Sequence, residues 1–212
     1  MDLYYFPLST YSQKVLIALK EKGLSAKLNI INMFNPEEKS AYINDVYPLG
    51  KIPLLVREDG WMIPESSIIV EYLDTHFDSG TQLIPADKEL SRQTRFYDRV
   101  SDLYFNDAIT TLLFQARREE ADRIPEKIEA ATFNLNCTYG YFNDILGKQT
   151  WLMGDNFSMA DCAAIPALYY AQESAPFDEF ENIVRYWQQA QERPSYKEVL
   201  EEAQPYLKDF GF

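Results

Sequence analysis

The stretch from residue 50 to residue 74 constrains the fold more than any other part of the sequence. Two short apolar runs flank an Asp-Gly pair at 59–60, the pair that most strongly indicates a tight β-hairpin turn. The first run opens with Ile52-Pro53, and proline belongs at the start or edge of a strand because it cannot donate a backbone hydrogen bond. The second run leads through Pro64 and Glu65 into a helical pattern of apolar residues. We therefore predict a hairpin followed directly by a helix that begins at Ser66.

The start of that helix has the residue types that bind a group carrying both an ammonium and a carboxylate. Free backbone N–H groups and the positive end of the helix dipole suit an anion at this position. Ser66 stands there, whereas Glu65 would oppose a plain anion and would pair with an ammonium. A capped surface helix with an exposed acid is the alternative for these two residues alone. The proline of Ile52-Pro53 leaves the backbone before it free to pair with a ligand, which favours the binding interpretation.

The composition predicts a globular chain without a nucleic-acid or membrane partner. The 212 residues are 46% hydrophobic, enough for one or two domains with a substantial core. The net charge of −13 argues against a nucleic-acid interface. Apolar runs stay shorter than a membrane span and residues 1–4 lack the basic region of a signal peptide, so we expect a cytoplasmic protein. With two cysteines and one histidine, we expect neither a disulfide framework nor a metal site.

The order of the predicted elements indicates an α/β domain followed by an all-α domain. A strand at 3–6, a helix that stops near Gly23 and a strand at 26–32 precede a short helix from Asn35, the hairpin and its helix. No strand pattern appears beyond Phe77. The predicted ranges are a thioredoxin-like βαβ-α-ββα domain at 1–77, a linker at 78–87 and an all-helical domain at 88–212.

Within the helical domain, the apolar spacing predicts a long amphipathic helix at 88–118 and a second helix from about 122 to 145. Ser158 and Asp161 have the spacing of a capping box, with Asp in place of the usual Glu. The alanine-rich helix behind them is predicted to form the core of the domain. Two further helices are expected at 180–192 and 194–203.

The segments Gly50 to Pro53, Glu65-Ser66 and Phe157 to Asp161 together resemble the glutathione S-transferase family, and the resemblance extends over essentially the whole chain. It implies a cis proline at Pro53, a cysteinyl unit of glutathione paired with the backbone of Ile52, and a γ-glutamyl end held by Glu65 and Ser66. Lys51 is a candidate for the glycyl carboxylate, with an exposed surface lysine as the alternative. The implied activity is the conjugation of glutathione, as co-substrate and without a metal, to a small apolar electrophile in detoxification.

The family also requires a group that stabilises the glutathione thiolate where the first helix begins. In members resembling this chain it is a serine in the loop after the first strand, here Ser9, which would act as a hydrogen-bond donor. A thiol with a pKa of about 8.5 must fall by about 1.5 units, roughly 2 kcal/mol, to be half ionised at pH 7. One hydrogen bond to a charged group contributes about 1.5–3 kcal/mol. A helix N-cap is the other role open to Ser9, and Tyr5 and then Ser12 are the alternative donors.

The resemblance places the electrophile between the two domains, with Tyr11, Tyr97 and Tyr104 as candidate walls, although aromatic residues at helical spacing more often belong to the core. It implies a homodimer in which Asp98 or Asp102 reaches the γ-glutamyl ammonium of the partner subunit. Surplus aromatic residues on the long helix also favour two-fold pairing, or else they line the electrophile cleft. A glutathione-dependent isomerase, peroxidase or dehalogenase remains open within the enzyme class.

Residues 11–12 and 65–74 also resemble the bacterial stringent starvation protein, a transferase-like protein that binds RNA polymerase. A protein-binding module on the same fold is therefore the alternative function. Ser9, Lys51 and Ile52 are all present in usable form, which favours the enzyme. The first loop lacks the cysteine of family members that reduce mixed disulfides, so we do not expect that activity.

Overall fold

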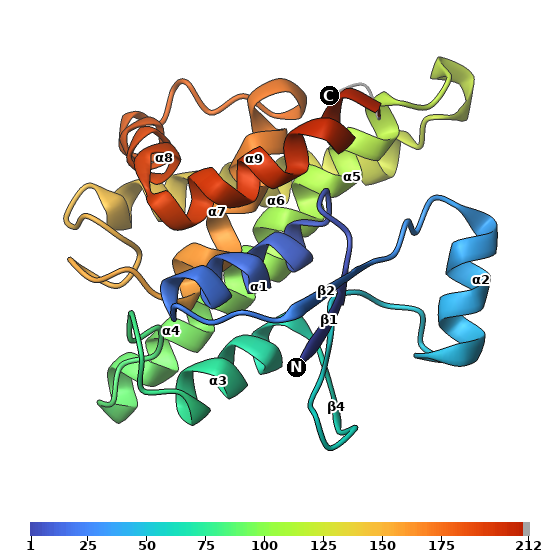
Figure 1. The fold of residues 1–212 in the computed structure, drawn as a ribbon. Coiled ribbons are helices and arrows are strands. Elements are labelled where there is room, and N and C mark those ends of the chain that lie inside the picture. The colour runs from blue at the N-terminus through green and yellow to red at the C-terminus, as the bar shows by residue number, and fades with distance from the viewer. Residues whose placement is uncertain (210–212) are drawn as a thin grey trace. The chain divides into compact units, whose positions relative to one another are not determined.

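The computed structural model describes residues 1–209, and these form two compact units. Unit 1 comprises residues 1–82 together with helix α9 (Pro194–Asp209), and unit 2 comprises Leu83–Arg193. Unit 1 contains a four-stranded sheet with helices, whereas the elements of unit 2 are helices (Figure 1). The predicted fold class is therefore confirmed.

The sheet of unit 1 has the strand order β2-β1-β3-β4. Its strands are β1 (Asp2–Tyr5), β2 (Lys27–Ile30), β3 (Leu54–Val56) and β4 (Met62–Pro64). β2 runs parallel to β1, while β3 is antiparallel to both β1 and β4. Tyr4 pairs with Leu54, and Leu54 pairs with Pro64, so one row of residues crosses three strands. The ends of β1 and β4 and the start of β3 therefore meet at one end of the sheet.

Helices α1 (Thr10–Glu21) and α3 (Ser66–His76) lie on one side of the sheet and α2 (Pro36–Asp45) on the other (Figure 1). α1 and α3 pack against each other, and both carry fully buried apolar side chains, among them Val15, Ile17, Ile69 and Leu73. The predicted hairpin and the helix that starts at Ser66 are confirmed, and this helix ends at His76. The short helix expected from Asn35 is observed as α2, and Asn35 caps it, because its side chain accepts from the N–H groups of Glu37 and Glu38.

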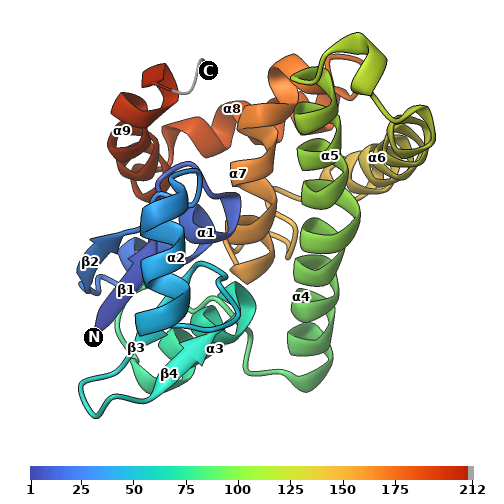
Figure 2. The same ribbon diagram turned by 90° about the vertical axis from the view of Figure 1, so that its right-hand side faces the viewer.

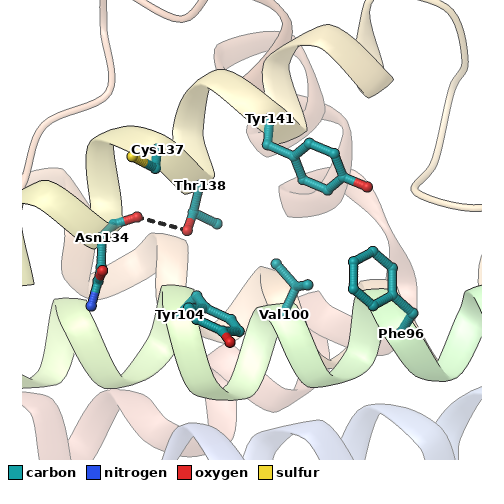
Figure 3. Close-up of a pocket in the computed structure, with 7 residues that line it drawn as sticks. All are labelled: Phe96, Val100, Tyr104, Asn134, Cys137, Thr138 and Tyr141. Atoms are coloured by element: carbon teal, nitrogen blue, oxygen red, sulfur yellow. Dashed lines mark hydrogen bonds between the residues drawn. The ribbon is translucent and has the colours of Figure 1, made fainter.

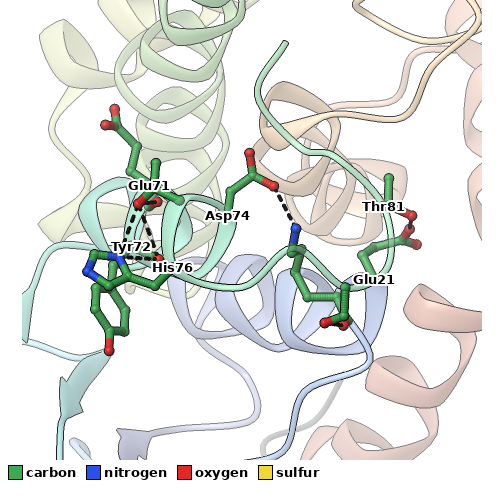
Figure 4. Close-up of polar contacts among 9 residues, drawn as sticks. Glu21, Glu71, Tyr72, Asp74, His76 and Thr81 are labelled. Atoms are coloured by element: carbon green, nitrogen blue, oxygen red, sulfur yellow. Dashed lines mark hydrogen bonds and ion pairs between the residues drawn. The ribbon is translucent and has the colours of Figure 1, made fainter. Parts of the chain in front are cut away.

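Polar contacts tie the end of α1 to α3 and to the segment that follows α3 (Figure 4). Lys22 Nζ lies 3.0 Å from Asp74 Oδ1, and both side chains are almost fully buried. Thr81 donates to Glu21 through its hydroxyl (2.6 Å) and through its backbone N–H (2.8 Å). Gly80 has a φ of +69°, and a Cβ there would lie 2.2 Å from the Glu21 carbonyl oxygen. The beginning of the predicted linker is therefore closely packed, and only glycine fits at position 80. The predicted domain boundaries remain a prediction.

Unit 2 is built on a long helical rod (Figure 2). The rod comprises α4 (Lys88–Val100), the π-helical segment η1 (Ser101–Asn106) and α5 (Asp107–Ala116). The predicted helix at 88–118 is thus observed with an inserted π turn, in which the Asp107 N–H donates to the Asp102 carbonyl. The remaining elements are the short 3₁₀ helix η2 (Glu120–Asp122), α6 (Pro125–Leu146), α7 (Met159–Ser174) and α8 (Glu181–Glu192).

Helix α7 is buried along most of its length, and its small side chains let α4, α5 and η1 pack against it. Its predicted role as the core helix is confirmed. Asp161, in the first turn, is fully buried and accepts four hydrogen bonds, from Leu152 N (2.9 Å), Ser158 N (2.8 Å), Ser158 Oγ (2.8 Å) and the Tyr186 hydroxyl (3.0 Å). Burial raises the pKa of Asp161 to about 6, while the hydrogen bonds act to lower it.

Replacement of Asp161 by Ala is expected to destabilise the protein strongly. The substitution leaves several buried donors without an acceptor, and the loss is expected to be about 3–5 kcal/mol of the free energy of unfolding. Denaturant unfolding measures it, with Asp155→Ala as the control, because Asp155 is an exposed acid in the segment that precedes α7. A loss below about 1 kcal/mol, the size of an ordinary helix-cap effect, would contradict this role of the four-bond network.

Helix α9 extends beyond the predicted end at residue 203 and reaches Asp209. Ala203 and Leu207 are buried, so apolar packing continues through the last turns in spite of Pro205. α9 packs against α1, and Lys20 pairs with Glu198 (2.9 Å) across the two helices. The helix that follows unit 2 in the chain therefore belongs to unit 1 by its contacts.

Residues 210–212 of the predicted range 88–212 lie outside the described residues. Within residues 1–209, no helix combines the length and apolar character needed to cross a bilayer.

Candidate functional site

Three predicted site segments converge at one end of the sheet in unit 1. The loop at 6–9 follows β1, Ile52-Pro53 precedes β3 and Glu65-Ser66 follows β4, and the row Tyr4–Leu54–Pro64 aligns these strand ends. Neighbouring strands lie about 4.8 Å apart, so β1 and β4 are separated by about 10 Å. Three residues of extended chain span at most about 10 Å. This end of the sheet therefore matches the length of an extended tripeptide.

The segment before β3 is held in a fixed shape by α2. The Ile52–Pro53 peptide bond is cis, as the resemblance implied. The Tyr42 hydroxyl donates to the carbonyl oxygen of Lys51 (2.8 Å), and the Tyr42 side chain is buried. Gly50 has a φ of +58° and lies so close to Ile43 that a Cβ would come within 2.8 Å of its side chain. The Lys51 side chain remains exposed beside this turn.

The residues at the start of α3 combine an unusual backbone with an uncapped helix end. Glu65 is exposed and has a φ of +69°, a conformation that costs a non-glycine residue about 1–3 kcal/mol. Ser66, the first residue of the helix, is 6% exposed. Within the part of the chain that the structure describes, no side-chain hydrogen bond caps α3. The positive end of this helix dipole is therefore available to an anion.

Ser9 occupies the N-cap of α1. Its Oγ accepts from the Ser12 N–H (3.3 Å), and its own N–H donates to the Phe6 carbonyl (3.0 Å). The side chain is partly exposed. The capping role weighed for Ser9 is thus observed. A hydroxyl accepts through a lone pair and donates through its proton, so the cap leaves the proton of Ser9 able to donate to a ligand.

The two alternative donors are less accessible. Tyr5 is 1% exposed, and its hydroxyl donates to Glu202. Burial, followed by the hydrogen bond to Glu202, raises the pKa of Tyr5 well above its ordinary value. Ser12 is fully buried, and its Oγ accepts from the Phe6 N–H (3.3 Å). Of the three hydroxyls, the one on Ser9 is the accessible one.

Sequence reasoning missed two side chains that hold these segments in place. Gln13 Nε2 donates to the Pro7 carbonyl (2.7 Å), and Lys14 Nζ donates to Ser67 Oγ (2.8 Å). Both side chains are buried within unit 1, at 3% and 1% exposure. A signal for Gln13 was available, because a residue four positions after Ser9 lies one helical turn further along the same face.

The predicted electrophile-binding residues fall in both units. Tyr11 is a partly exposed residue of α1, whereas Tyr97 is 6% exposed and contacts Tyr141 (ring centroids 6.2 Å apart) within unit 2. Tyr104 is 53% exposed and faces a groove between the α4–η1 rod and α6, with a volume of about 360 Å³ (Figure 3). Asp98 and Asp102 are buried, at 1% and 5% exposure. The roles of all five residues remain predictions.

Comparison with known proteins identifies the family. The model for the glutathione S-transferase N-terminal domain matches residues 3–81, and the model for the C-terminal domain matches residues 105–194. The chain belongs to the glutathione S-transferase family of enzymes. The resemblance drawn from the sequence is therefore confirmed.

Individual relatives are distant but match over nearly their full length. Glutathione S-transferase F13 of Arabidopsis thaliana is 26% identical over 211 residues, which cover 94% of each chain. A crystal structure of a glutathione S-transferase from Methylobacillus flagellatus with GSH bound is 28% identical, with a TM-score of 0.83 and coverage of 93% of this chain and 98% of that one. A stringent starvation protein A homolog of Coxiella burnetii is 26% identical over 212 residues, covering 99% and 95% of the two chains.

Proposed function

We propose that this protein is a cytoplasmic enzyme that binds glutathione at the end of its sheet, stabilises the thiolate through Ser9 and conjugates it to a small apolar electrophile. The observation that carries the proposal is the alignment of three segments by the row Tyr4–Leu54–Pro64. This row brings the donor in the loop after β1, the cis-proline turn before β3 and the acid at the uncapped start of α3 to one end of the sheet, over a length that suits one tripeptide. The GSH-bound relative from Methylobacillus flagellatus supports the choice of glutathione.

In this proposal the γ-glutamyl end of glutathione lies at the start of α3. Glu65 pairs with its ammonium, while Ser66 and the helix dipole bind its carboxylate. The backbone of Ile52 pairs with the cysteinyl unit, and Pro53 fixes the turn that presents it. Lys51 binds the glycyl carboxylate. The unusual φ of Glu65 supports this role, because strained backbone conformations cluster at ligand-binding sites.

Glu65→Gln and Ser66→Ala are each expected to weaken glutathione binding about tenfold to a hundredfold, since each removes a charge-assisted hydrogen bond of about 1.5–3 kcal/mol. Titration calorimetry with millimolar glutathione measures the effect. Glu58→Gln is the matched control, because it makes the same charge change at the exposed turn of the β3–β4 hairpin. No heat of binding in the wild type would contradict the proposed site.

Ser9 acts as a donor throughout the reaction. Its proton remains on the hydroxyl and stabilises the sulfur anion, which attacks the electrophilic carbon while the leaving group departs with the bonding electron pair. The N-terminus of α1 adds a favourable dipole at the same place. Tyr11 and Tyr97 are the proposed walls for the electrophile, and Tyr104 is the third candidate wall unless the groove that it lines is the dimer interface proposed below. The same thiolate would serve an isomerase, peroxidase or dehalogenase, so a panel of electrophiles and peroxides defines the reaction class.

Ser9→Ala is expected to raise the pKa of the bound glutathione thiol by about 1–2 units, the equivalent of one hydrogen bond to a charged group. Thiolate absorbance in the ultraviolet, followed against pH, measures the shift. Asp87→Ala controls for the loss of a helix cap, because the Asp87 side chain caps α4 in unit 2. Ser9→Thr keeps the hydroxyl, and its thiol pKa is expected to stay close to that of the wild type. Equal pKa values in the wild type and Ser9→Ala would remove Ser9 from the mechanism.

We also propose that the protein is a homodimer in which unit 1 of one protomer packs on the α4–η1 rod of the other. Each unit exposes an apolar groove that supports this assembly. In unit 2 it is the groove of Figure 3, which is lined by Phe96, Val100, Tyr104, Asn134, Cys137, Thr138 and Tyr141. In unit 1 a groove of about 310 Å³ includes Trp61 and Ile68, whose side chains are 66% and 51% exposed. Exposed apolar surfaces of this kind typically mark interfaces.

Sedimentation equilibrium at micromolar concentration is expected to give twice the chain mass of 24.7 kDa. Trp61→Asp places a charge in the proposed interface and is expected to weaken the dimer by about 2 kcal/mol or more, as for a central aromatic contact. Leu49→Asp is the control, since Leu49 is similarly exposed at 70% and lies outside both grooves. A wild-type mass near that of one chain would refute the dimer.

A protein-binding module of the stringent starvation protein type is the second candidate function, supported by the Coxiella burnetii relative. Such a module has no need of a glutathione site. The uncapped start of α3 and the accessible hydroxyl of Ser9 favour the enzyme. Glutathione binding by the wild type separates the two functions.

A further inference from the structure

The first loop is closed by contacts from the first turns of α1. The Ser9 N–H donates to the Phe6 carbonyl, and the Phe6 N–H donates to Ser12 Oγ. Pro7 has no N–H, so its carbonyl is its one polar backbone group, and Gln13 Nε2 donates to it at 2.7 Å. Gln13 and Pro7 are both buried, and a hydrogen bond shielded from water restricts the loop more strongly than an exposed one.

The other atom of the same amide group is not satisfied. Gln13 is only 3% exposed, and its Oε1 is buried without a hydrogen-bond partner among the described residues. Turning the amide over would place Oε1 against the Pro7 carbonyl, two acceptors facing each other, so the contact with Pro7 defines the orientation. An apolar side chain of the same volume would avoid the cost of the unpaired Oε1. Packing alone therefore does not explain a glutamine at this position.

We propose that Gln13 is a positioning residue that fixes the first loop through the Pro7 carbonyl and thereby aims the Ser9 hydroxyl at the glutathione sulfur. This inference rests on the proposed function, because it requires Ser9 to be the thiolate donor. Gln13 itself does not touch the reacting atoms. The Ser9 hydroxyl lies two residues beyond the carbonyl that Gln13 holds, so a shift of Pro7 moves Ser9 directly.

The test is Gln13→Met, which keeps the volume of the side chain and removes both amide atoms. The folded state is expected to lose little stability, because the lost bond to Pro7 is offset by the removal of the unpaired Oε1. The pKa of the bound glutathione thiol is expected to rise by about half a unit or more. At pH 6.5, kcat is expected to fall about threefold or more with KM for glutathione little changed, because a rise of half a unit in the thiol pKa lowers the thiolate fraction by up to about threefold.

Two comparisons separate positioning from a general structural effect. Gln115→Met is the matched control, because Gln115 is a buried glutamine of α5 whose Oε1 accepts from the Ile124 N–H (2.8 Å), in unit 2. It is expected to lower the melting temperature without changing the thiol pKa. In a Ser9→Ala background, Gln13→Met is expected to produce no additional pKa shift, because the group it positions is absent. Gln13→Asn, which keeps the amide but shortens its reach, provides the same comparison if the methionine variant does not fold.

An unchanged thiol pKa and kcat in Gln13→Met would overturn the inference, and so would an equal shift in the wild-type and Ser9→Ala backgrounds. The single variant Ser9→Ala reports on the proposed function separately. If Ser9→Ala alone leaves the thiol pKa unchanged, the role of Ser9 fails, and the positioning role of Gln13 fails with it. If Ser9→Ala raises the pKa and Gln13→Met does not, the function stands and this inference alone is rejected.

Discussion

The pairing of β3 with its two neighbours is the constraint on which the rest of unit 1 depends. β3 is only three residues long, yet its register with β1 and β4 determines how the loop after β1, the turn before β3 and the start of α3 are aligned. A slip of one residue would turn Leu54 and Leu55, both fully buried, toward the opposite faces and would move the start of α3 relative to the first loop. The apolar burial that stabilises the sheet therefore also sets the geometry of the candidate glutathione site.

Side chains from helices then fix the segments that extend beyond the strand ends. Gln13 holds the Pro7 carbonyl, Tyr42 holds the Lys51 carbonyl and Lys14 holds the Ser67 hydroxyl. Each of these three donors is buried, although the segments that they hold border the site. Ordered loops of this kind lower the entropic cost of binding, because the loops are already in place before the ligand arrives. This arrangement explains why polar side chains occupy interior positions of unit 1 that apolar residues could fill.

The features predicted correctly from the sequence are those encoded within a few residues. The Asp59-Gly60 turn, the start of a helix at Asn35 and the Ser158–Asp161 capping box each depend on neighbours in the chain, and all three are observed. The π turn at Ser101–Asn106 and the length of α9 depend on tertiary packing against α7 and α1, so helical periodicity could not indicate them. For the site, residue type indicated Ser9, Glu65 and Ser66. The helical spacing could have drawn attention to Gln13, but its bond to the Pro7 carbonyl depends on the path of the loop, which the spacing does not define.

The assignment of Ser9 as the thiolate donor rests on how each hydroxyl uses its proton. The Tyr5 proton is committed to Glu202, and its release to a sulfur would leave that carboxylate without a buried partner. Ser9 faces no such conflict, because its cap uses a lone pair. The Ser12 N–H on that lone pair also restricts rotation about the Cβ–Oγ bond, which turns the proton away from the helix. Capping and thiolate stabilisation are therefore compatible in one hydroxyl, and the cap makes the donor more rigid than a free serine would be.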